Sequence, residues 1–316
     1  TSVPASYPLN LGMCGMHGKY PSIKAQSECD LLLAVGVRFS DRATGDLNEY
    51  TKKCMTVHID IDRAEIGKNV SPDVSLWGDV KEILDKILEE LPEERHPEWV
   101  NELEGYKNEM ILPAPKPYGP EAIIEEVHKH CTEDTVVATD VGQHQMFSAR
   151  YSKFNRTRSF ITSGGLGTMG FGLPAAMGAK LGVPDREVVV MMGDGGFQMT
   201  MQELGTIMQN KIGVKMIVLN NHYLGMVRQW QQLFFEKRYS YTSLENPKFT
   251  MIAEAYGIPN RRVTQLSELK GAIDELAKAP GAYFLEVDVL SEENVFPMVP
   301  AGASLSDLIA KEPDKK

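Results

Sequence analysis

The sequence contains no apolar run long enough to span a bilayer, and it has no excess of basic residues. We therefore expect no membrane segment. The formal net charge is −10 at pH 7, and acidic residues are spread over amphipathic stretches such as 82–90. A nucleic-acid partner normally requires a clustered basic surface. The composition thus predicts a protein that binds neither a membrane nor a nucleic acid.

Cysteine is also scarce. The chain has only Cys14, Cys29, Cys54 and Cys131, which lie far apart and form no C-x-x-C pair. Zinc sites and disulfide frameworks use closely spaced cysteines. We expect reduced thiols and a cytoplasmic protein, or a plastid protein if the source is a plant. Residues 1–4 lack the basic and apolar regions of a signal peptide, so we expect the chain to begin inside a domain.

With 316 residues, 42% of them hydrophobic, the chain can bury more than one core. The proline-rich stretch 112–120 cannot sustain a helix or a central strand, and it predicts a linker. The predicted domains are therefore 1–111 and 121–316, the second ending in a polar tail. Apolar strand-like runs alternate with helical stretches, which predicts an α/β fold with two mainly parallel sheets flanked by helices.

The most informative motif is M-G-D-G-G-F at 192–197. It follows the apolar run 188–192, which predicts a buried parallel strand. Asp194 then lies at the carboxyl end of that strand, where open α/β sheets bind ligands. The flanking glycines allow the backbone to approach phosphate oxygens, and a helix predicted over 202–210 points its amino end nearby.

A second apolar strand, 214–219, ends in Asn220-Asn221. Two neighbouring strand ends thus offer a carboxylate and an amide carbonyl, which are hard oxygen donors suited to Mg²⁺ bridging a diphosphate. A glycine-flanked Asp in such a turn can also be only a helix cap. The separation of Asp194 from Asn221 spans one strand-helix-strand unit and favours the magnesium site.

Two further segments of the second half carry polar groups or glycines near predicted strand ends. Gln143 and His144 follow the strand 135–139 and can donate hydrogen bonds to phosphate oxygens, although a histidine at a helix start is also a common cap. Gly167 and Met169 belong to the glycine-rich turn 163–170. Such a turn suits either cofactor approach or tight packing, and methionine is an ordinary gap filler.

In the first half, the apolar strands 30–37 and 56–62 predict half of a nucleotide-binding sheet. Gly36 would let a cofactor lie against the backbone. Asp60 could accept hydrogen bonds from a ribose or ribityl hydroxyl, but an Asp at a strand end is also a common turn former. Asp79 is adequately explained as the N-cap of the helix that follows it.

The G-D-G and N-N pair resembles the signature of thiamine-diphosphate enzymes. Other motifs resemble acetohydroxyacid synthase, also called acetolactate synthase: L-G-M-C-G-M-H-G at 11–18, G-V-R-F-S-D-R at 36–42, H-I-D-I-D at 58–62, G-D-V at 78–80 and G-M-V-x-Q-W at 225–230. The resemblance implies a Rossmann-like central domain in part, followed by a thiamine-diphosphate-binding fold. No segment resembles the amino-terminal pyrimidine domain of that family.

The resemblance also implies three cofactors and their contacts. For FAD the implied residues are Gly15, Met16, His17, Gly36, Arg38, Asp60, Ile61, Asp79 and Val80. For thiamine diphosphate they are Gln143, His144, Gly167, Met169, Gly193, Gly195, Gly196 and Met226. For Mg²⁺ they are Asp194, Asn221 and the backbone carbonyl of Tyr223. The implied catalytic residues are Met169, which enforces a folded cofactor conformation, Trp230, which shapes the pocket for the second substrate, and Arg42, which lies at the substrate channel.

In that family pyruvate is decarboxylated and joined to a second 2-ketoacid, giving acetolactate or acetohydroxybutyrate for branched-chain amino acid biosynthesis. The implied partners are 2-ketoacids, further copies in a homo-oligomer, a pyrimidine domain acting in trans and possible regulatory subunits. The isolated chain is then expected to be inactive. Two alternatives stay open: another thiamine-diphosphate and FAD enzyme, such as a pyruvate oxidase or glyoxylate carboligase, or a non-catalytic cofactor-binding fragment.

Overall fold

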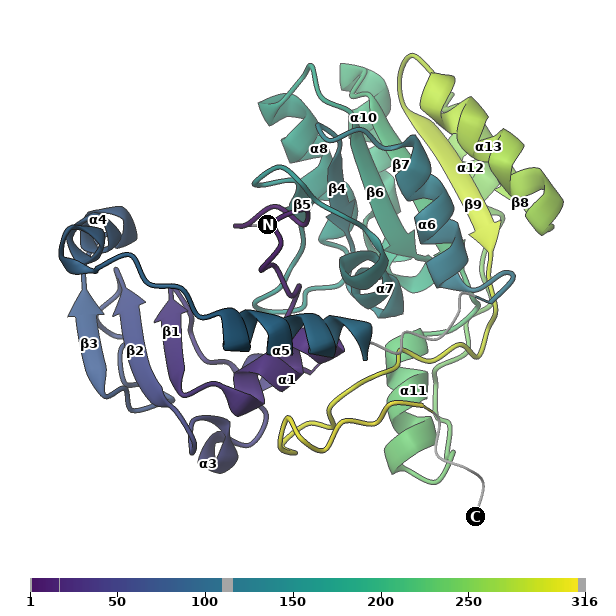
Figure 1. Ribbon diagram of the computed structural model, residues 1–316. Coiled ribbons are helices and arrows are strands. Elements are labelled where there is room, and N and C mark those ends of the chain that lie inside the picture. Colours follow the sequence, from purple (N-terminus) through teal and green to yellow (C-terminus); the bar gives the residue numbers. More distant parts are fainter. Residues whose placement is uncertain (1, 17, 110–115, 312–316) are drawn as a thin grey trace. The chain divides into compact units, whose positions relative to one another are not determined.

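The computed structural model describes residues 2–16, 18–109 and 116–311. The chain forms two compact units, and each is discontinuous in sequence. The three-strand unit combines Leu11–Pro113 with Phe296–Lys316, and the six-strand unit combines Thr1–Asn10 with Ala114–Val295. In the described residues, each unit contains a parallel sheet with helices packed against it (Figure 1), which confirms the predicted fold class.

The sheet of the six-strand unit has the order β5-β4-β6-β7-β9-β8, and all of its pairings are parallel. Its central strands are runs of valine, methionine, isoleucine and leucine that are buried on both faces, as parallel strands usually are. The strands are β4 (Val136–Thr139), β5 (Phe160–Ile161), β6 (Val188–Gly193), β7 (Val214–Asn220), β8 (Asn260–Val263) and β9 (Tyr283–Asp288).

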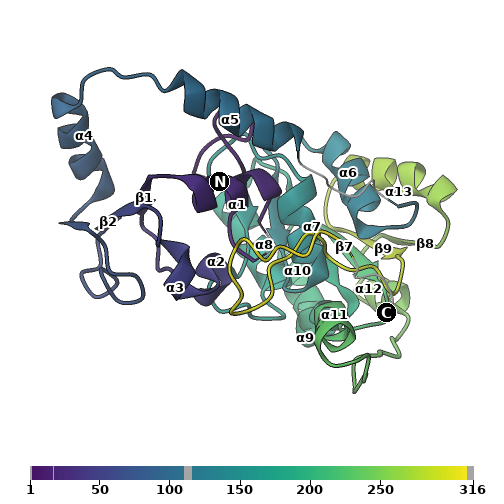
Figure 2. The ribbon, with the colours of Figure 1, turned by 60° about the horizontal axis from the view of Figure 1, so that its bottom comes forward.

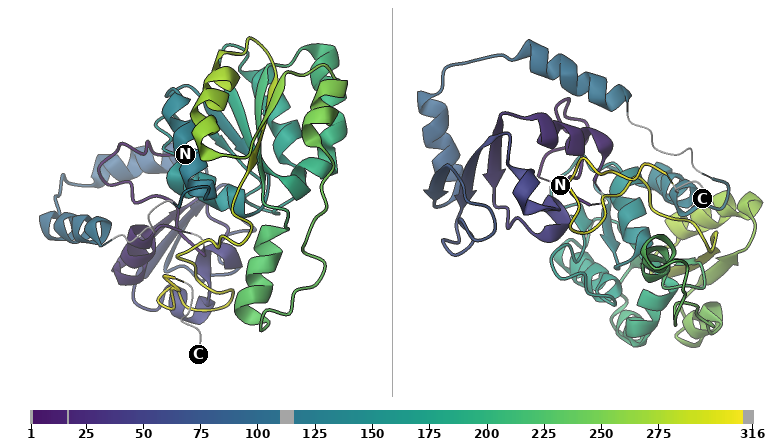
Figure 3. Two further views of the ribbon diagram at one scale, coloured as in Figure 1. Left: turned by 90° about the vertical axis from the view of Figure 1, so that its right-hand side faces the viewer. Right: turned by 90° about the horizontal axis from the view of Figure 1, so that it is seen from below.

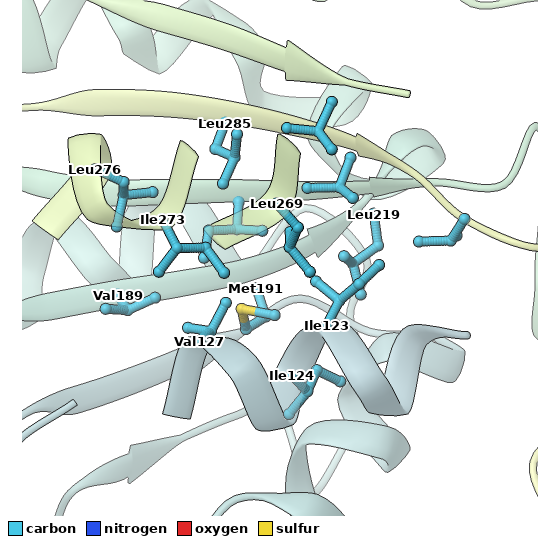
Figure 4. Packing of buried hydrophobic residues seen from close by; sticks show 14 of the residues in the cluster. Ile123, Ile124, Val127, Val189, Met191, Leu219, Leu269, Ile273, Leu276 and Leu285 are labelled. Atoms are coloured by element: carbon cyan, nitrogen blue, oxygen red, sulfur yellow. The ribbon is translucent and has the colours of Figure 1, made fainter. Parts of the chain in front are cut away.

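Alternate residues of β6 and β7 point into two separate cores, one on each face of the sheet. Val189 and Met191 join one core, in which Ile123 of α6 and Ile273 of α13 also lie (Figure 4). On the other face, Val190 packs with helices α8, α9, α10 and α12. Helices therefore cover both sides of the sheet, as Figures 1 and 3 show.

The helices of this unit have the following bounds. They are α6 (Pro120–His130), α7 (Gln143–Tyr151), α8 (Gly172–Gly182), α9 (Asp194–Thr200), η1 (Met201–Glu203), α10 (Leu204–Asn210), α11 (Gly225–Phe234), α12 (Phe249–Ala255) and α13 (Leu266–Lys278).

In the three-strand unit the sheet order is β1-β2-β3, again parallel. The strands are β1 (Leu31–Val35), β2 (Met55–Asp60) and β3 (Val74–Trp77). The helices are α1 (Tyr20–Glu28), α2 (Asp41–Thr44), α3 (Leu47–Tyr50), α4 (Val80–Glu90) and α5 (Pro97–Asn108). Helices α1 and α5 lie side by side (Figure 1) and bury Ala25 against Leu103 and Tyr106. Asp79 caps α4 as predicted, because its carboxylate accepts hydrogen bonds from the backbone of Lys81 and Glu82.

The unit boundaries differ from the contiguous domains that the sequence predicts. Each end of the chain belongs to the other unit than the sequence that adjoins it. The segment after Val295 returns to the three-strand unit, where Val299 N donates to Met16 O at 2.9 Å and Asp46 N donates to Ala303 O at 2.9 Å. The opening segment joins the six-strand unit through a bond from Ala5 N to Phe154 O. Part of the predicted linker, 112–115, lies outside the described residues.

Two predictions from composition can be compared with the structure. Among the described residues, no helix combines the length and apolar character needed to cross a bilayer. All four cysteines belong to the described part of the chain and are free thiols, as predicted.

Candidate functional site

Three neighbouring strands of the six-strand sheet end at one edge, and a polar segment follows each of them. β4 ends at Thr139, β6 at Gly193 and β7 at Asn220, and β6 lies between the other two. A cavity of about 230 Å³ is lined by the residues that follow these strands. The carboxyl edge of a parallel sheet is where this class of fold binds ligands.

The helix that begins at this edge is not the predicted one. α9 begins at Asp194 itself, whereas the predicted helix 202–210 corresponds to η1 and α10. The predicted helix is thus present, but we missed α9 because we interpreted Gly195-Gly196 as part of a loop. In the structure these glycines form the first turn of α9, which the fully buried Phe197 anchors in the core. Helices α9 and α11 lie beside each other (Figure 2), and a Cβ on Gly195 would be 2.8 Å from Leu224.

Every residue predicted to contact thiamine diphosphate or Mg²⁺ lines this one cavity. They are Gln143, His144, Gly167, Met169, Gly193, Asp194, Gly195, Gly196, Asn221, Tyr223 and Met226. They come from four separate stretches of sequence, so their convergence is a property of the fold rather than of any single motif. Apolar side chains, including Leu219 and Val289, complete the wall.

Asp194 is 1% exposed, and burial raises the pKa of its carboxyl group, while hydrogen bonds, the strongest from Asn246, act in the opposite direction. No lysine or arginine pairs with it in the described part of the chain. A buried carboxylate without a cation is costly, and a bound metal ion would remove that cost. Asn221, whose Oδ1 accepts a hydrogen bond from Tyr223 N at 3.0 Å, supplies a second oxygen at the same cavity.

Within the described residues, no three histidine, cysteine or acidic side chains form a cluster able to hold a metal. A site built only of protein carboxylates is therefore not present in that part of the chain. One carboxylate with amide and backbone oxygens suits an ion such as Mg²⁺, which draws further ligands from a diphosphate and water.

His144 is buried, and burial lowers its pKa to about 4 although Asp140 acts in the opposite direction. The imidazole is therefore neutral at pH 7. Its Nε2 atom is buried and has no hydrogen-bond partner among the described residues. Buried polar atoms normally have partners, so this unpaired ring nitrogen in the cavity wall is available to a bound ligand.

Gln143 is held by a residue that the sequence did not single out for this role. Gln143 Nε2 donates to Gln229 Oε1 at 2.9 Å and to Glu293 O at 2.7 Å. Gln229 is itself fixed, because it exchanges two hydrogen bonds with the backbone of Val295. Both amide hydrogens of Gln143 are thus donated to protein oxygens, so donation from this amide to a phosphate stays a prediction.

Two of the glycines are required because a side chain lies directly against their backbone. A Cβ on Gly225 would lie 2.1 Å from Gln143 Oε1, and one on Gly196 would lie 2.3 Å from Asp140 Oδ1. Asp140 is fully buried and accepts hydrogen bonds from the backbone of Gly170 and Gly172, so it holds the glycine-rich turn against β4. We did not predict that role, although the position of Asp140 directly after a strand was the available signal.

Trp230 does not line this cavity. It lies one turn beyond Met226 on α11 and contributes to a separate surface hollow with Val227, Phe235 and Arg238. Its ring also packs at 5.1 Å, centroid to centroid, against Phe234. Val227 is shared by the hollow and the cavity, so the two lie next to each other on α11.

The residues predicted to contact FAD belong to the three-strand unit, and His17 lies outside the described residues. Gly36, Asp60, Ile61, Asp79 and Val80 follow or close the three parallel strands, so the structure brings them to one edge of that sheet. A Cβ on Gly36 would meet nothing within 4 Å, and its φ is +61°. Ile61 is 70% exposed. This edge therefore has the open backbone and uncovered apolar surface that a flat cofactor could occupy.

Of the remaining first-half residues, Gly15, Met16 and Arg42 lie together in the same unit. Met16 N donates to Arg42 O at 2.7 Å, and a Cβ on Gly15 would lie 2.5 Å from that same carbonyl oxygen. The Arg42 side chain is exposed and pairs with Asp41 at 2.6 Å. Arg38 is exposed, and its carbonyl accepts a hydrogen bond from Asn69.

Comparison with known proteins agrees with this geometry. Residues 140–287 match the family described as "Thiamine pyrophosphate enzyme, C-terminal TPP binding domain", and residues 1–87 match "Thiamine pyrophosphate enzyme, central domain". The chain therefore belongs to the thiamine pyrophosphate enzymes and carries two of their domains.

Individual relatives show which thiamine pyrophosphate enzymes the chain is similar to. The chain is 43% identical over 314 residues to the acetolactate synthase isozyme 2 large subunit of Escherichia coli (strain K12), covering 98% of this chain and 57% of that protein. It is 41% identical over 324 residues to acetolactate synthase 1, chloroplastic, of Oryza sativa subsp. japonica, covering 97% and 50%. The chain is thus homologous to acetolactate synthase large subunits, and it spans about half the length of these relatives.

Proposed function

We propose that this chain is the carboxyl-terminal portion of an acetolactate synthase catalytic subunit that works with thiamine diphosphate, Mg²⁺ and FAD. The convergence of every predicted diphosphate and metal residue on one cavity is the observation that carries the proposal. Identity of 40–43% to acetolactate synthase large subunits over nearly the whole chain supports the choice of reaction over other thiamine-dependent enzymes.

When bound, thiamine diphosphate supplies an electron sink for the negative charge left by decarboxylation of a 2-ketoacid. The protein's own residues would hold and orient it. Asp194, Asn221 and the Tyr223 carbonyl would bind a Mg²⁺ ion that bridges the diphosphate, and His144 Nε2 would contact a phosphate oxygen. Met169, whose Cε would lie 3.8 Å from a Cβ on Gly195, would support the folded form of the cofactor.

In this proposal the substrates are pyruvate and a second 2-ketoacid, and Trp230 and Arg42 contribute to substrate selection. FAD would bind at the carboxyl edge of the three-strand sheet, next to Gly36, Asp60 and Ile61. No net redox change accompanies the condensation, so its role would be structural. The four free thiols suit a reducing compartment, either the cytoplasm or a plastid.

The proposal includes partners. In the family that this chain resembles, a glutamate of a pyrimidine-binding domain assists the first proton removal, whereas the two family models that match this chain are the central and the carboxyl-terminal domains. We propose that the active site uses that domain in trans, within a homo-oligomer to which a regulatory subunit could be added.

The test is acetolactate formation from pyruvate with Mg²⁺, thiamine diphosphate and FAD. The 316-residue chain alone should form essentially no acetolactate. Adding the amino-terminal part of the E. coli relative that this chain does not match should restore synthesis. A product other than acetolactate would favour a different thiamine-diphosphate and FAD enzyme, and rapid turnover by the purified chain alone would contradict the proposed division of the active site.

A further inference from the structure

One oxygen of Asp194 is held by a side chain that lies outside all of the motifs discussed above. Asn246 Nδ2 donates to Asp194 Oδ2 at 2.7 Å and to Asn220 Oδ1 at 2.9 Å. Gln198 lies one turn after Asp194 on α9, and its Nε2 donates to Asn246 Oδ1 at 2.9 Å. Both the nitrogen and the oxygen of the Asn246 amide are thus hydrogen-bonded. Its orientation is fixed, because an ionised carboxylate can only accept.

The second acceptor of Asn246 is also fixed. Asn220 is 1% exposed, and its Nδ2 donates to Glu286 Oε1 at 2.8 Å. Glu286 is a buried residue of β9, and Arg262 approaches the same oxygen at 3.5 Å. Since the amide nitrogen of Asn220 faces Glu286, its oxygen must face Asn246. Two carboxylates, Glu286 and Asp194, are thereby joined through two oriented amides.

The segment that carries Asn246 is docked on the stretch that carries the other candidate metal ligands. Leu224 N donates to Thr242 O, and Leu244 N donates to His222 O, both at 2.8 Å. An antiparallel bridge pairs Tyr223 with Ser243. These bonds set the position of Asn246 relative to Asn221 and Tyr223.

A buried arginine reinforces the docking. The Arg228 guanidinium lies 5.5 Å from the ring centre of Tyr223 and 5.4 Å from that of Tyr239, and it pairs with Glu292 at 3.2 Å. Cation–π contacts of this kind are stronger when the cation is removed from water, and the Arg228 side chain is only 2% exposed. The chain on both sides of α11 is therefore tied to the metal-binding stretch.

We propose that Asn246 is a positioning residue for Mg²⁺, which fixes the orientation of the Asp194 carboxylate and links it to the segment carrying Asn221 and Tyr223. This inference rests on the proposed function, because it assigns Asn246 a role toward the metal of that site. Hydrogen bonds to ligating carboxylates are part of the design of metal sites, and their loss typically costs about 10–100-fold in metal affinity.

A comparison of Mg²⁺ with Ca²⁺ binding distinguishes a positioning role of Asn246 from a packing role. Mg²⁺ demands near-ideal octahedral geometry, whereas Ca²⁺ accepts flexible arrangements with longer bonds. A carboxylate that loses its fixed orientation should therefore harm Mg²⁺ binding more than Ca²⁺ binding. A general disturbance of the cavity would weaken both ions alike.

The experiment uses the full 316-residue chain and the variant Asn246→Leu, which has a similar volume but no donor. Mg²⁺ and Ca²⁺ are titrated separately by calorimetry at a fixed excess of thiamine diphosphate, and the melting temperature is recorded without ligands. The matched control is Asn210→Leu, which removes an exposed asparagine at the end of α10 whose Nδ2, among the described residues, bonds only to Thr206 O. Gln198→Leu, which removes only the bond that orients the Asn246 amide, should give a smaller loss.

For Asn246→Leu we expect Mg²⁺ affinity to fall about 10–100-fold, Ca²⁺ affinity to fall less, and the control to match the unsubstituted chain. An unchanged Mg²⁺ affinity would overturn the inference while leaving the proposed function intact. Equal losses for both ions together with a lower melting temperature would also overturn it, since that is the result of a packing role. If the unsubstituted chain binds neither ion with the cofactor, the proposed function fails and the inference fails with it.

Discussion

At the scale of single residues, the cavity joins one buried acid with one buried neutral base. Asp194 and His144 both lie where water is excluded, and burial disfavours the charged form of each. Their environments differ in what relieves that cost. A divalent cation would stabilise the carboxylate, whereas the histidine needs no counter-charge because it is neutral.

The lowered pKa of His144 makes a prediction about acid stability. The folded-state pKa is about 4, below the ordinary 6.5 of a free histidine. Between these values the unfolded chain binds a proton that the folded chain does not, so stability falls as the pH falls from 6.5 toward 4. From pH 7 to pH 5 this amounts to about 2 kcal/mol at most.

The variant His144→Gln keeps a polar group but removes this titration. Urea unfolding of both proteins at pH 7 and pH 5 should show a smaller loss of unfolding free energy in the variant. If both proteins lose stability equally over this range, His144 is not buried as a neutral ring.

The strand-end residues Gln143, His144, Asp194 and Asn221 could be predicted because each follows a strand in a short polar motif, and the other predicted lining residues were implied by the family resemblance. The residues that hold them were not predicted. Asn246, Gln229 and Asp140 act through hydrogen bonds across long stretches of sequence, such as the 52 positions between Asn246 and Asp194. No local pattern distinguishes such an asparagine or glutamine from a surface residue.

At the scale of elements, α11 forms one wall of the cavity and presents its first residue to Gln143. Helix geometry places Gly225 directly against that side chain, with only 2.1 Å between a Cβ at this position and Gln143 Oε1. The Gln143 amide cannot move aside without losing its bonds to Gln229 and Glu293.

Gly225→Ala should therefore be destabilising by about 1–3 kcal/mol, as overpacking of a tight site generally is, and it should weaken thiamine diphosphate binding. Gly105 in α5 offers a matched control, because a Cβ there meets nothing within 4 Å. Gly105→Ala should stabilise its helix by about 0.5–1 kcal/mol. Thermal unfolding of the two variants measures the contrast, and equal effects would argue against the close approach at α11.

The position of Trp230 on α11 leads to a prediction about substrates. In an enzyme completed with the pyrimidine domain, Trp230→Leu should change the ratio of acetohydroxybutyrate to acetolactate when 2-ketobutyrate and pyruvate compete, because a large contact surface is lost beside the cavity. The matched control is Phe234→Leu, which alters the ring that packs against Trp230. An unchanged ratio with the fold intact would leave Trp230 with a packing role only.

The strands β1, β2, β4, β6 and β7 could be predicted, since their apolar runs have few alternatives in a parallel sheet, whereas β3, β5, β8 and β9 were not predicted. The helix after Asp194 was missed because two glycines at its start hide its pattern. The unit boundaries differed because segment 296–311 contains no regular element, and single hydrogen bonds such as that from Val299 to Met16 decide where it lies. Sequence periodicity carries no information about such bonds.

At the scale of the whole molecule, the chain forms one unit with a three-stranded sheet and one with a six-stranded sheet. The six-strand unit contains a complete cavity of its own, lined only by its own residues. Binding of the diphosphate and the metal is therefore a property that the chain should show by itself, even though we expect turnover to need a further domain.

The most direct measurement is calorimetric titration of thiamine diphosphate into the 316-residue chain, with and without Mg²⁺, and into the variant Asp194→Ala. We predict binding that requires Mg²⁺ and that is lost in the variant, because the only carboxylate that lines the cavity among the described residues has been removed. Binding of equal strength without Mg²⁺, or unchanged affinity in Asp194→Ala, would contradict the assignment of this cavity as the thiamine diphosphate and magnesium site.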